Sequence, residues 1–84
     1  MNGQTATAEA RLKRVIVEVL LIDDDEYLDT NGPDEIESWD SLAAVTLASA
    51  LEKEFGIPVP ADDMASFNTI GDIRQFCRAN GIDV

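Results

Sequence analysis

The sequence pattern changes at Glu37-Ser38-Trp39-Asp40-Ser41-Leu42, where an acidic stretch without regular hydrophobic spacing is followed by a helical pattern. We predict a helix from Ser41 to Phe55. Asp40 is its expected N-cap, because an aspartate there accepts hydrogen bonds from the unpaired backbone N–H groups of the first turn. Gly56 is expected to end the helix, because glycine readily adopts the left-handed conformation that closes many helices. The other predicted elements pack around this helix.

Upstream, apolar residues at three-and-four spacing predict a first helix from about Thr7 to Ile22, with a buried stripe of Leu12, Val15, Ile16, Val19 and Leu20. An acidic loop, residues 23–38, follows it and contains the turn signal Asn31-Gly32-Pro33. A loop this long in a small domain is usually functional or held down by its own apolar residues. We expect this loop to be held against the core by three of its own residues, Tyr27, Leu28 and Ile36.

Downstream, the sequence Ile-Pro-Val-Pro at residues 57–60 cannot continue a helix and is expected to run extended over the core. One short helical turn is predicted within residues 61–68. A last helix is predicted to reach about Ala79. It is opened by Thr69 with Asp72 three residues later, a variant of the capping box, and stopped by Asn80-Gly81.

These elements predict an all-α fold, a small four-helix bundle of three main helices plus one short helix, with a long loop between the first two helices. The 84 residues are expected to form a single domain, 1–84. The first six residues are small and polar, and we expect them to be disordered.

Charge is the strongest signal in the composition. The chain carries 17 Asp and Glu against 6 Lys and Arg, a formal net charge of −11. Such a chain repels nucleic acid and anionic membrane surfaces, so its partners are expected to present basic patches. No segment approaches the ~20 consecutive apolar residues that a membrane span requires. The start of the sequence has neither a basic region nor a hydrophobic run for export, so we expect a cytoplasmic location.

Two apolar residues of the helix predicted from Ser41 lie away from its core face. At the ~100° spacing of helical residues, one arc collects that face: Ala44, Leu47, Ala48, Leu51 and Phe55. Leu42 and Val45 fall outside this arc. Either they pack beneath the long loop, or they form a small apolar contact for a partner, rimmed by Asp40, Glu52 and Glu54.

The chain lacks the groups that serine and cysteine catalysis need. It has no histidine, so a Ser-His-Asp site is excluded. Neither of its two lysines, Lys13 and Lys53, is placed to activate Ser41. The single cysteine, Cys77, lies on the predicted buried stripe of the last helix, where a thiol without a cationic neighbour is inert. We therefore expect no catalytic residue.

The acidic residues do not form a recognisable metal site. Counting along residues 23–34 fails to give the ligand spacing of a calcium-binding EF-hand loop. The acidic pairs Asp62-Asp63 and Glu52 with Glu54 are interpreted as solvated charge rather than as acid–base catalysts. The sequence predicts no dedicated metal site.

Ser41 is better placed to be modified by another enzyme than to act as a catalytic nucleophile. A capping role is the simplest local interpretation of a serine at a helix start. The same position would also suit a phosphate ester, because the positive end of the helix stabilises an anion.

The wider pattern favours the second interpretation. Asp40-Ser41-Leu42 is followed by Leu51-Glu52-Lys53-Glu54-Phe55-Gly56-Ile57, by Val59-Pro60 and by Phe67-Asn68-Thr69-Ile70-Gly71-Asp72-Ile73. In combination these motifs resemble the acyl carrier proteins, over about Thr7 to Ala79. The resemblance implies that Ser41 receives 4'-phosphopantetheine from coenzyme A through a separate phosphopantetheinyl transferase. The arm would hold an acyl group as a thioester, and the chain would be a discrete, monomeric carrier without catalytic activity of its own.

The resemblance also implies roles for neighbouring residues. Asp40 is the flanking acid, and three residues fall where family members meet partners: Leu42, Val45 and Glu52. Trp39 departs from the common patterns, since fatty-acid carriers often show Gly-Ala-Asp before the serine and peptidyl carriers Gly-Gly-His or Gly-Gly-Asp. The form Trp39-Asp40-Ser41 looks more like free-standing carriers of specialised pathways. Trp39 either packs over the start of the helix or contacts the cargo or a partner.

The cargo implied by the resemblance is an acyl intermediate of fatty-acid, polyketide or related natural-product biosynthesis, delivered between a loading enzyme and synthases or transferases. Peptidyl, aminoacyl or D-alanyl cargo is the alternative. The rival hypothesis from another class is an unmodified acidic interaction domain, which would use the face with Leu42 and Val45 to dock or regulate a basic partner.

Overall fold

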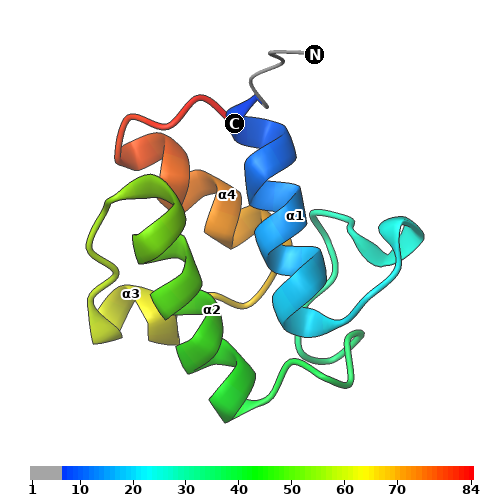
Figure 1. Ribbon diagram of the computed structural model, residues 1–84. Helices are drawn as coiled ribbons and strands as arrows, with labels where there is room; N and C mark the ends of the chain where they lie inside the picture. Colours follow the sequence, from blue (N-terminus) through cyan, green and yellow to red (C-terminus); the bar gives the residue numbers. More distant parts are fainter. Residues whose placement is uncertain (1–6) are drawn as a thin grey trace.

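The computed structural model describes residues 7–84, and the predicted disorder of residues 1–6 lies outside the described residues. The chain forms the predicted four-helix bundle, with helices α1 (Ala8–Leu20), α2 (Ser41–Phe55), α3 (Ala61–Ala65) and α4 (Ile70–Ala79) (Figure 1). Residues 7–84 contain no strand. Within the same range, every helix is too short or too polar to cross a membrane.

The bounds of α2 are those predicted, because both of its caps form. Asp40 Oδ1 accepts a hydrogen bond from the Ala43 amide at 2.8 Å. At the other end, Gly56 takes the left-handed conformation with φ 67°, and its amide donates to Glu52 O at 2.8 Å. The sequence signals for this helix are therefore confirmed at both ends.

Helix α1 ends two residues earlier than predicted. Leu20 is its last residue, and Leu21 takes a left-handed conformation with φ 55° and ψ 46°. The amides of Leu21 and Ile22 both donate to Val17 O, which closes the helix end. This turn directs Ile22 into the core, where it is buried. The predicted end at Ile22 was wrong because leucine rarely closes a helix in this way.

The C-terminal half follows the prediction. Val59 is buried in the extended segment, and α3 is the short helix expected within residues 61–68. Helix α4 opens with the predicted capping box, in which Thr69 Oγ1 accepts from the Asp72 amide at 3.1 Å and Asp72 Oδ2 accepts from the Thr69 amide at 3.1 Å. Asn80 is its C-cap.

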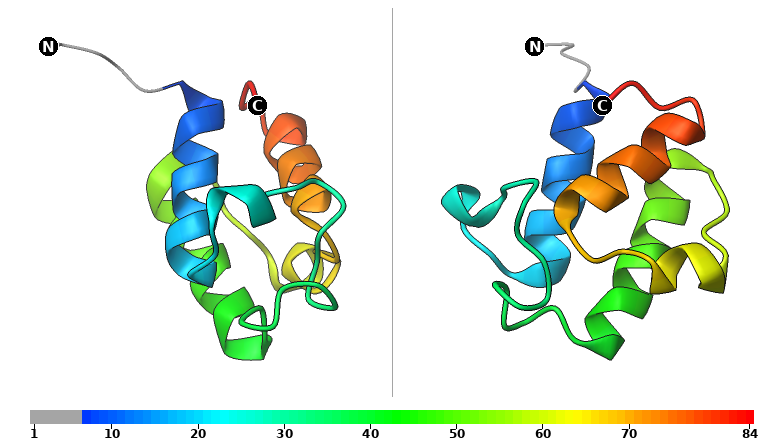
Figure 2. Two further views of the ribbon diagram at one scale, coloured as in Figure 1. Left: turned by 90° about the vertical axis from the view of Figure 1, so that its right-hand side faces the viewer. Right: turned by 180° about the vertical axis from the view of Figure 1, so that it is seen from behind.

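Helices α1, α2 and α4 supply most of the core, and the segments between helices add the rest. Helices α1 and α2 lie side by side and run in opposite directions, and α4 crosses the pair on one side (Figures 1 and 2). Nine side chains of the described residues have less than 2% of their surface exposed: Leu12, Ile16, Leu20, Ile36, Leu47, Leu51, Ile70, Ile73 and Cys77. Helix α3 contributes no buried residue, so it lies against the bundle rather than inside it.

The acidic loop 23–38 is ordered by its own apolar residues, though not by all those expected. Ile36 is buried and Tyr27 is partly buried, as predicted. Leu28 is 52% exposed, so its predicted role in holding the loop was wrong. The loop also contains a 3₁₀ turn, Asp24–Glu26, that the sequence pattern did not predict.

The loop is fastened to the start of α4 by its backbone. The carbonyl oxygens of Asn31 and Asp29 accept from the amides of Ile70 and Gly71, at 2.9 and 3.0 Å. These carbonyls satisfy first-turn N–H groups that a helix cannot pair internally. Gly32 lies so close to this junction that a Cβ atom on it would sit 1.9 Å from Asn68 O. Contacts with the start of α4 and the segment before it therefore hold the middle of the loop in place.

Candidate functional site

Ser41 lies at the first residue of α2, with its side chain exposed. The capping bond to the first turn is made by Asp40, so Ser41 is not needed as the N-cap. Within residues 7–84, the Ser41 hydroxyl has no hydrogen-bond partner. Its neighbours include the exposed carboxylate of Asp40, and first-turn N–H groups add the positive end of the helix dipole. The hydroxyl is thus accessible and free to be modified.

Leu42 and Val45 are exposed beside Ser41. Leu42 has 75% and Val45 54% of its surface accessible. The alternative in which both residues pack beneath the long loop is therefore wrong. The structure instead places two branched apolar side chains on the open face of α2, within one turn of Ser41, as a contact surface for a partner requires.

Trp39 is buried, with only 4% of its surface exposed. This agrees with the interpretation that it packs over the start of α2, and it leaves little of the ring for a partner to touch. The residue also lines an open hollow of about 340 Å³ beside the serine, together with Pro33, Asp40, Ser41, Ala44, Met64, Ala65, Phe67 and Asn68. The hollow lies between the start of α2 on one side and, on the other, α3 and the residues that follow it.

Glu54 was placed wrongly by the helical-wheel argument. Instead of rimming the contact face, its carboxylate turns to α1, where Arg11 Nε lies 2.6 Å and Arg14 Nη2 3.1 Å away. The hydrogen bond from Arg11, assisted by the charge of Arg14, lowers the pKa of Glu54 from its ordinary value. The guanidinium of Arg11 also lies over the ring of Phe55, 5.0 Å from its centre. Glu54 therefore joins α1 to α2.

Glu52 has a structural contact of its own, so it is more than solvated charge. Its Oε2 accepts from the Val59 amide at 2.8 Å, which fixes the segment between α2 and α3. The residue remains exposed, as a partner-facing position requires. Glu52 thus links the open face of α2 to the segment that carries α3.

A polar cluster around Arg74 holds the acidic loop against two helices, and sequence reasoning did not find it. The Arg74 guanidinium from α4 pairs with Glu9 in the first turn of α1 and with Asp29 in the loop, the latter at 3.0 Å. Burial disfavours the charged guanidinium, but hydrogen bonds to Glu9 and Asp29 outweigh it and raise the pKa of Arg74. Burial, followed by the charge of Glu9, raises the pKa of Tyr27 to about 12.

Cys77 is fully buried, as expected from its place on the core stripe. Burial raises the pKa of its thiol to about 11, although the charge of Arg74 acts in the opposite direction. A thiol with this pKa is almost entirely protonated at neutral pH and reacts poorly. Cys77 is therefore a packing residue of the core.

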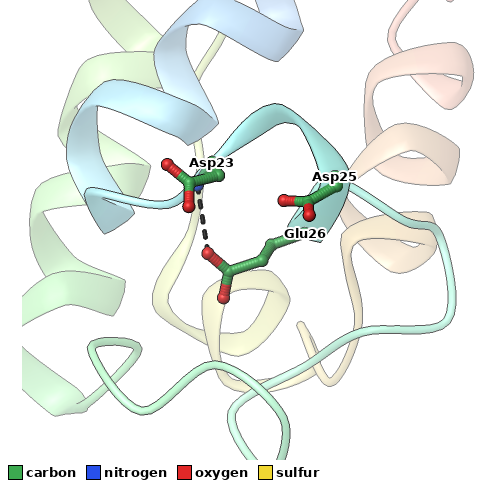
Figure 3. Close-up of side chains that lie close together, drawn as sticks. All are labelled: Asp23, Asp25 and Glu26. Atoms are coloured by element: carbon green, nitrogen blue, oxygen red, sulfur yellow. Dashed lines mark hydrogen bonds between the residues drawn. The ribbon is translucent and has the colours of Figure 1, made fainter.

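The 3₁₀ turn gathers three carboxylates, from Asp23, Asp25 and Glu26 (Figure 3), and one oxygen of each lies within 4.8 Å of one oxygen of the others. Counting along the chain did not predict this cluster. The Glu26 carboxylate accepts from the Asp23 amide at 3.1 Å, so it already closes the turn. Exposed acidic groups often gather without an ion, and we do not assign a metal site here.

The family comparison agrees with this geometry. A family model described as "Phosphopantetheine attachment site" matches residues 10–77, which include all four helices in whole or in large part.

Proposed function

This chain belongs to the phosphopantetheine attachment site family, whose members carry a covalently attached 4'-phosphopantetheine, and on this premise we propose that Ser41 is the attachment residue. The observation that carries the proposal is the free, exposed hydroxyl at the start of α2, beside a capping residue that makes its own bond. First-turn N–H groups of α2 favour the phosphate negative charge that attachment would place there.

The prosthetic group supplies a terminal thiol that can hold a carboxylic acid as a thioester. The residues of this chain have simpler roles, in which Ser41 provides the oxygen, Asp40 fixes the first turn, and Leu42 and Val45 mark the approach surface. The chain has no histidine to act as a base. The base and the catalytic machinery for attachment would therefore belong to a separate phosphopantetheinyl transferase, and the chain itself would have no turnover.

Carrier domains of this family interact with phosphopantetheinyl transferases and biosynthetic enzymes. We propose that the partners of this chain present basic patches, because its formal net charge is −11. The proposed form is a monomeric carrier in the cytoplasm, and its proposed cargo is an acyl group of fatty-acid, polyketide or related specialised biosynthesis. Peptidyl, aminoacyl or D-alanyl cargo is the competing proposal.

Attachment is tested by incubating the protein with coenzyme A and a broad-specificity phosphopantetheinyl transferase, followed by intact mass measurement. The wild type should gain the mass of one 4'-phosphopantetheine, and Ser41→Ala should gain nothing. Ser49→Ala, which removes another exposed hydroxyl from α2, is the matched control and should behave as the wild type. An unchanged wild type would favour the rival function, an unmodified acidic domain that docks a basic partner.

The cargo class is tested on protein isolated from its own cell. Hydroxylamine cleaves thioesters, and the released product is identified by mass. A released acyl hydroxamate supports the acyl proposal, whereas a released aminoacyl or peptidyl hydroxamate would replace it.

A further inference from the structure

Leu21 is a residue that the fold itself does not explain. It is the most exposed large apolar side chain among residues 7–84, with 84% of its surface accessible. It also takes the left-handed conformation, at φ 55°, where a Cβ atom is unfavourable and glycine or asparagine is the common choice. Leucine here gains little packing and strains the backbone, which points to a use outside the core.

Leu21 lies at the same end of the bundle as Ser41. The last turn of α1 and the first turn of α2 share that end (Figures 1 and 2). Ser38 Oγ donates to the carbonyl of Leu20, the residue before Leu21. Since consecutive Cα atoms are ~3.8 Å apart, Ser38 lies no more than about 11 Å from Ser41. A standard protein interface covers ~800 Å² on each partner, a disc roughly 30 Å across, so one interface can include both Leu21 and Ser41.

The surroundings of Leu21 carry negative charge. Asp23, Asp24 and Asp25 follow it and are exposed, and Glu37 and Asp40 are exposed on the approach to Ser41. Of these five carboxylates, Asp24 alone forms an ion pair within residues 7–84, with Lys13 at 3.8 Å. Between Val15 and Ile73 the sequence has a single base, Lys53, and it lies in the last turn of α2, at the opposite end of that helix from Ser41. A complementary surface would combine an apolar contact with Lys and Arg at its edge.

We propose that Leu21 is a second apolar anchor for the enzyme that modifies Ser41, so that the docking surface runs from Leu42 and Val45 across to the end of α1. The occupant is the active-site face of a phosphopantetheinyl transferase, with an apolar contact flanked by Lys or Arg, because that enzyme must approach this end to reach Ser41. The inference rests on the proposed function.

The substitution Leu21→Asn separates docking from folding, because it should lower the rate of modification without lowering the melting temperature. Asparagine tolerates the left-handed conformation, so the melting temperature should stay the same or rise by a few degrees. Loss of the anchor should lower kcat/KM for modification by a transferase about 5- to 10-fold.

Leu28→Asn is the matched control. Leu28 is also an exposed loop leucine, but it follows Tyr27, whose hydroxyl donates to Glu9 in the first turn of α1. That turn lies about 18 Å along the helix from Leu21. The control should be modified at the wild-type rate.

The outcomes are distinct. A wild type that accepts the group while Leu21→Asn is modified equally fast overturns the inference and leaves the proposed function standing. A slower Leu21→Asn with a matching fall in melting temperature assigns Leu21 to the fold and also overturns it. A wild type that is never modified defeats the proposed function and the inference together.

Discussion

Single side chains at the start and along the open face of α2 divide into those that hold the backbone and those that stay free. Asp40 caps α2 and Glu52 holds the Val59 amide, so both have structural roles. Leu42 and the Ser41 hydroxyl are exposed and make no such bond within the described residues. Attachment and docking are therefore assigned to side chains whose loss should leave the fold intact.

Among the glycines of residues 7–84, Gly32 has the least room for a side chain. In Gly32→Ala, the new Cβ atom would lie 1.9 Å from the backbone oxygen of Asn68, so the loop must move away from the start of α4. We expect a loss of about 2–3 kcal/mol in the free energy of unfolding, the upper range for overpacking. Urea denaturation measures it. Asp34→Ala, at an exposed position two residues on, should cost little, and equal stability of the two variants would contradict the close approach.

Helices α1 and α2 are joined by an ion pair whose strength depends on pH. Because Arg11 lowers the pKa of Glu54, the contribution of Glu54 to stability is complete above its ordinary pKa of 4.5 and is lost as pH falls through the lower folded value. Glu54→Gln should cost about 1 kcal/mol at pH 7. The difference from the wild type should shrink toward pH 3.

Urea midpoints of the wild type and Glu54→Gln at the two pH values check this prediction. Glu37→Gln, at an exposed loop position, serves as the control for loss of one negative charge. A difference between wild type and Glu54→Gln that stays constant with pH would show that Arg11 does not stabilise the ionised carboxylate.

The open face of α2 presents Leu42 and Val45 to solvent. Leu42→Asp and Val45→Asp should leave the melting temperature within a few degrees of the wild type, because both side chains are more than half exposed. Each should slow modification by a transferase at least 10-fold, since a charge would enter the apolar centre of the contact. Gln75→Asp adds the same charge at an exposed position of α4 and should be modified normally. Large losses of stability in Leu42→Asp and Val45→Asp would show that these two side chains are part of the core.

The elements themselves were largely predictable from local signals. Asp40 and Gly56 marked both ends of α2, and Thr69 with Asp72 marked the start of α4, because caps depend on residues near in sequence. Helical periodicity placed Leu42 and Val45 away from the core face of α2, but it left open whether the loop covered them, and the structure shows that both are exposed.

The rest depended on contacts between distant residues. Arg74 meets Glu9 across 65 positions of sequence, and Glu54 meets Arg11 across 43. No periodic pattern encodes such pairs, so Glu54 was assigned to the wrong surface. The left-handed Leu21 was missed for a related reason, because the residue type gives no signal for that conformation.

At the scale of the whole molecule, like charge opposes the compact state. With 17 acids and 6 bases, repulsion between carboxylates should exceed the attraction in the few ion pairs. Added sodium chloride should therefore raise the melting temperature at pH 7 through screening. The increase should be smaller near pH 4.5, where many carboxylates are protonated. A melting temperature that does not respond to salt at pH 7 would contradict this picture.

The proposed function depends on which residue carries the prosthetic group. Fragmentation mass spectrometry of the modified protein locates the added group on a single residue. The whole mass of 4'-phosphopantetheine should be found on Ser41 and on no other hydroxyl. A group located on any other residue, or no group at all after treatment with coenzyme A and transferase, would contradict this prediction.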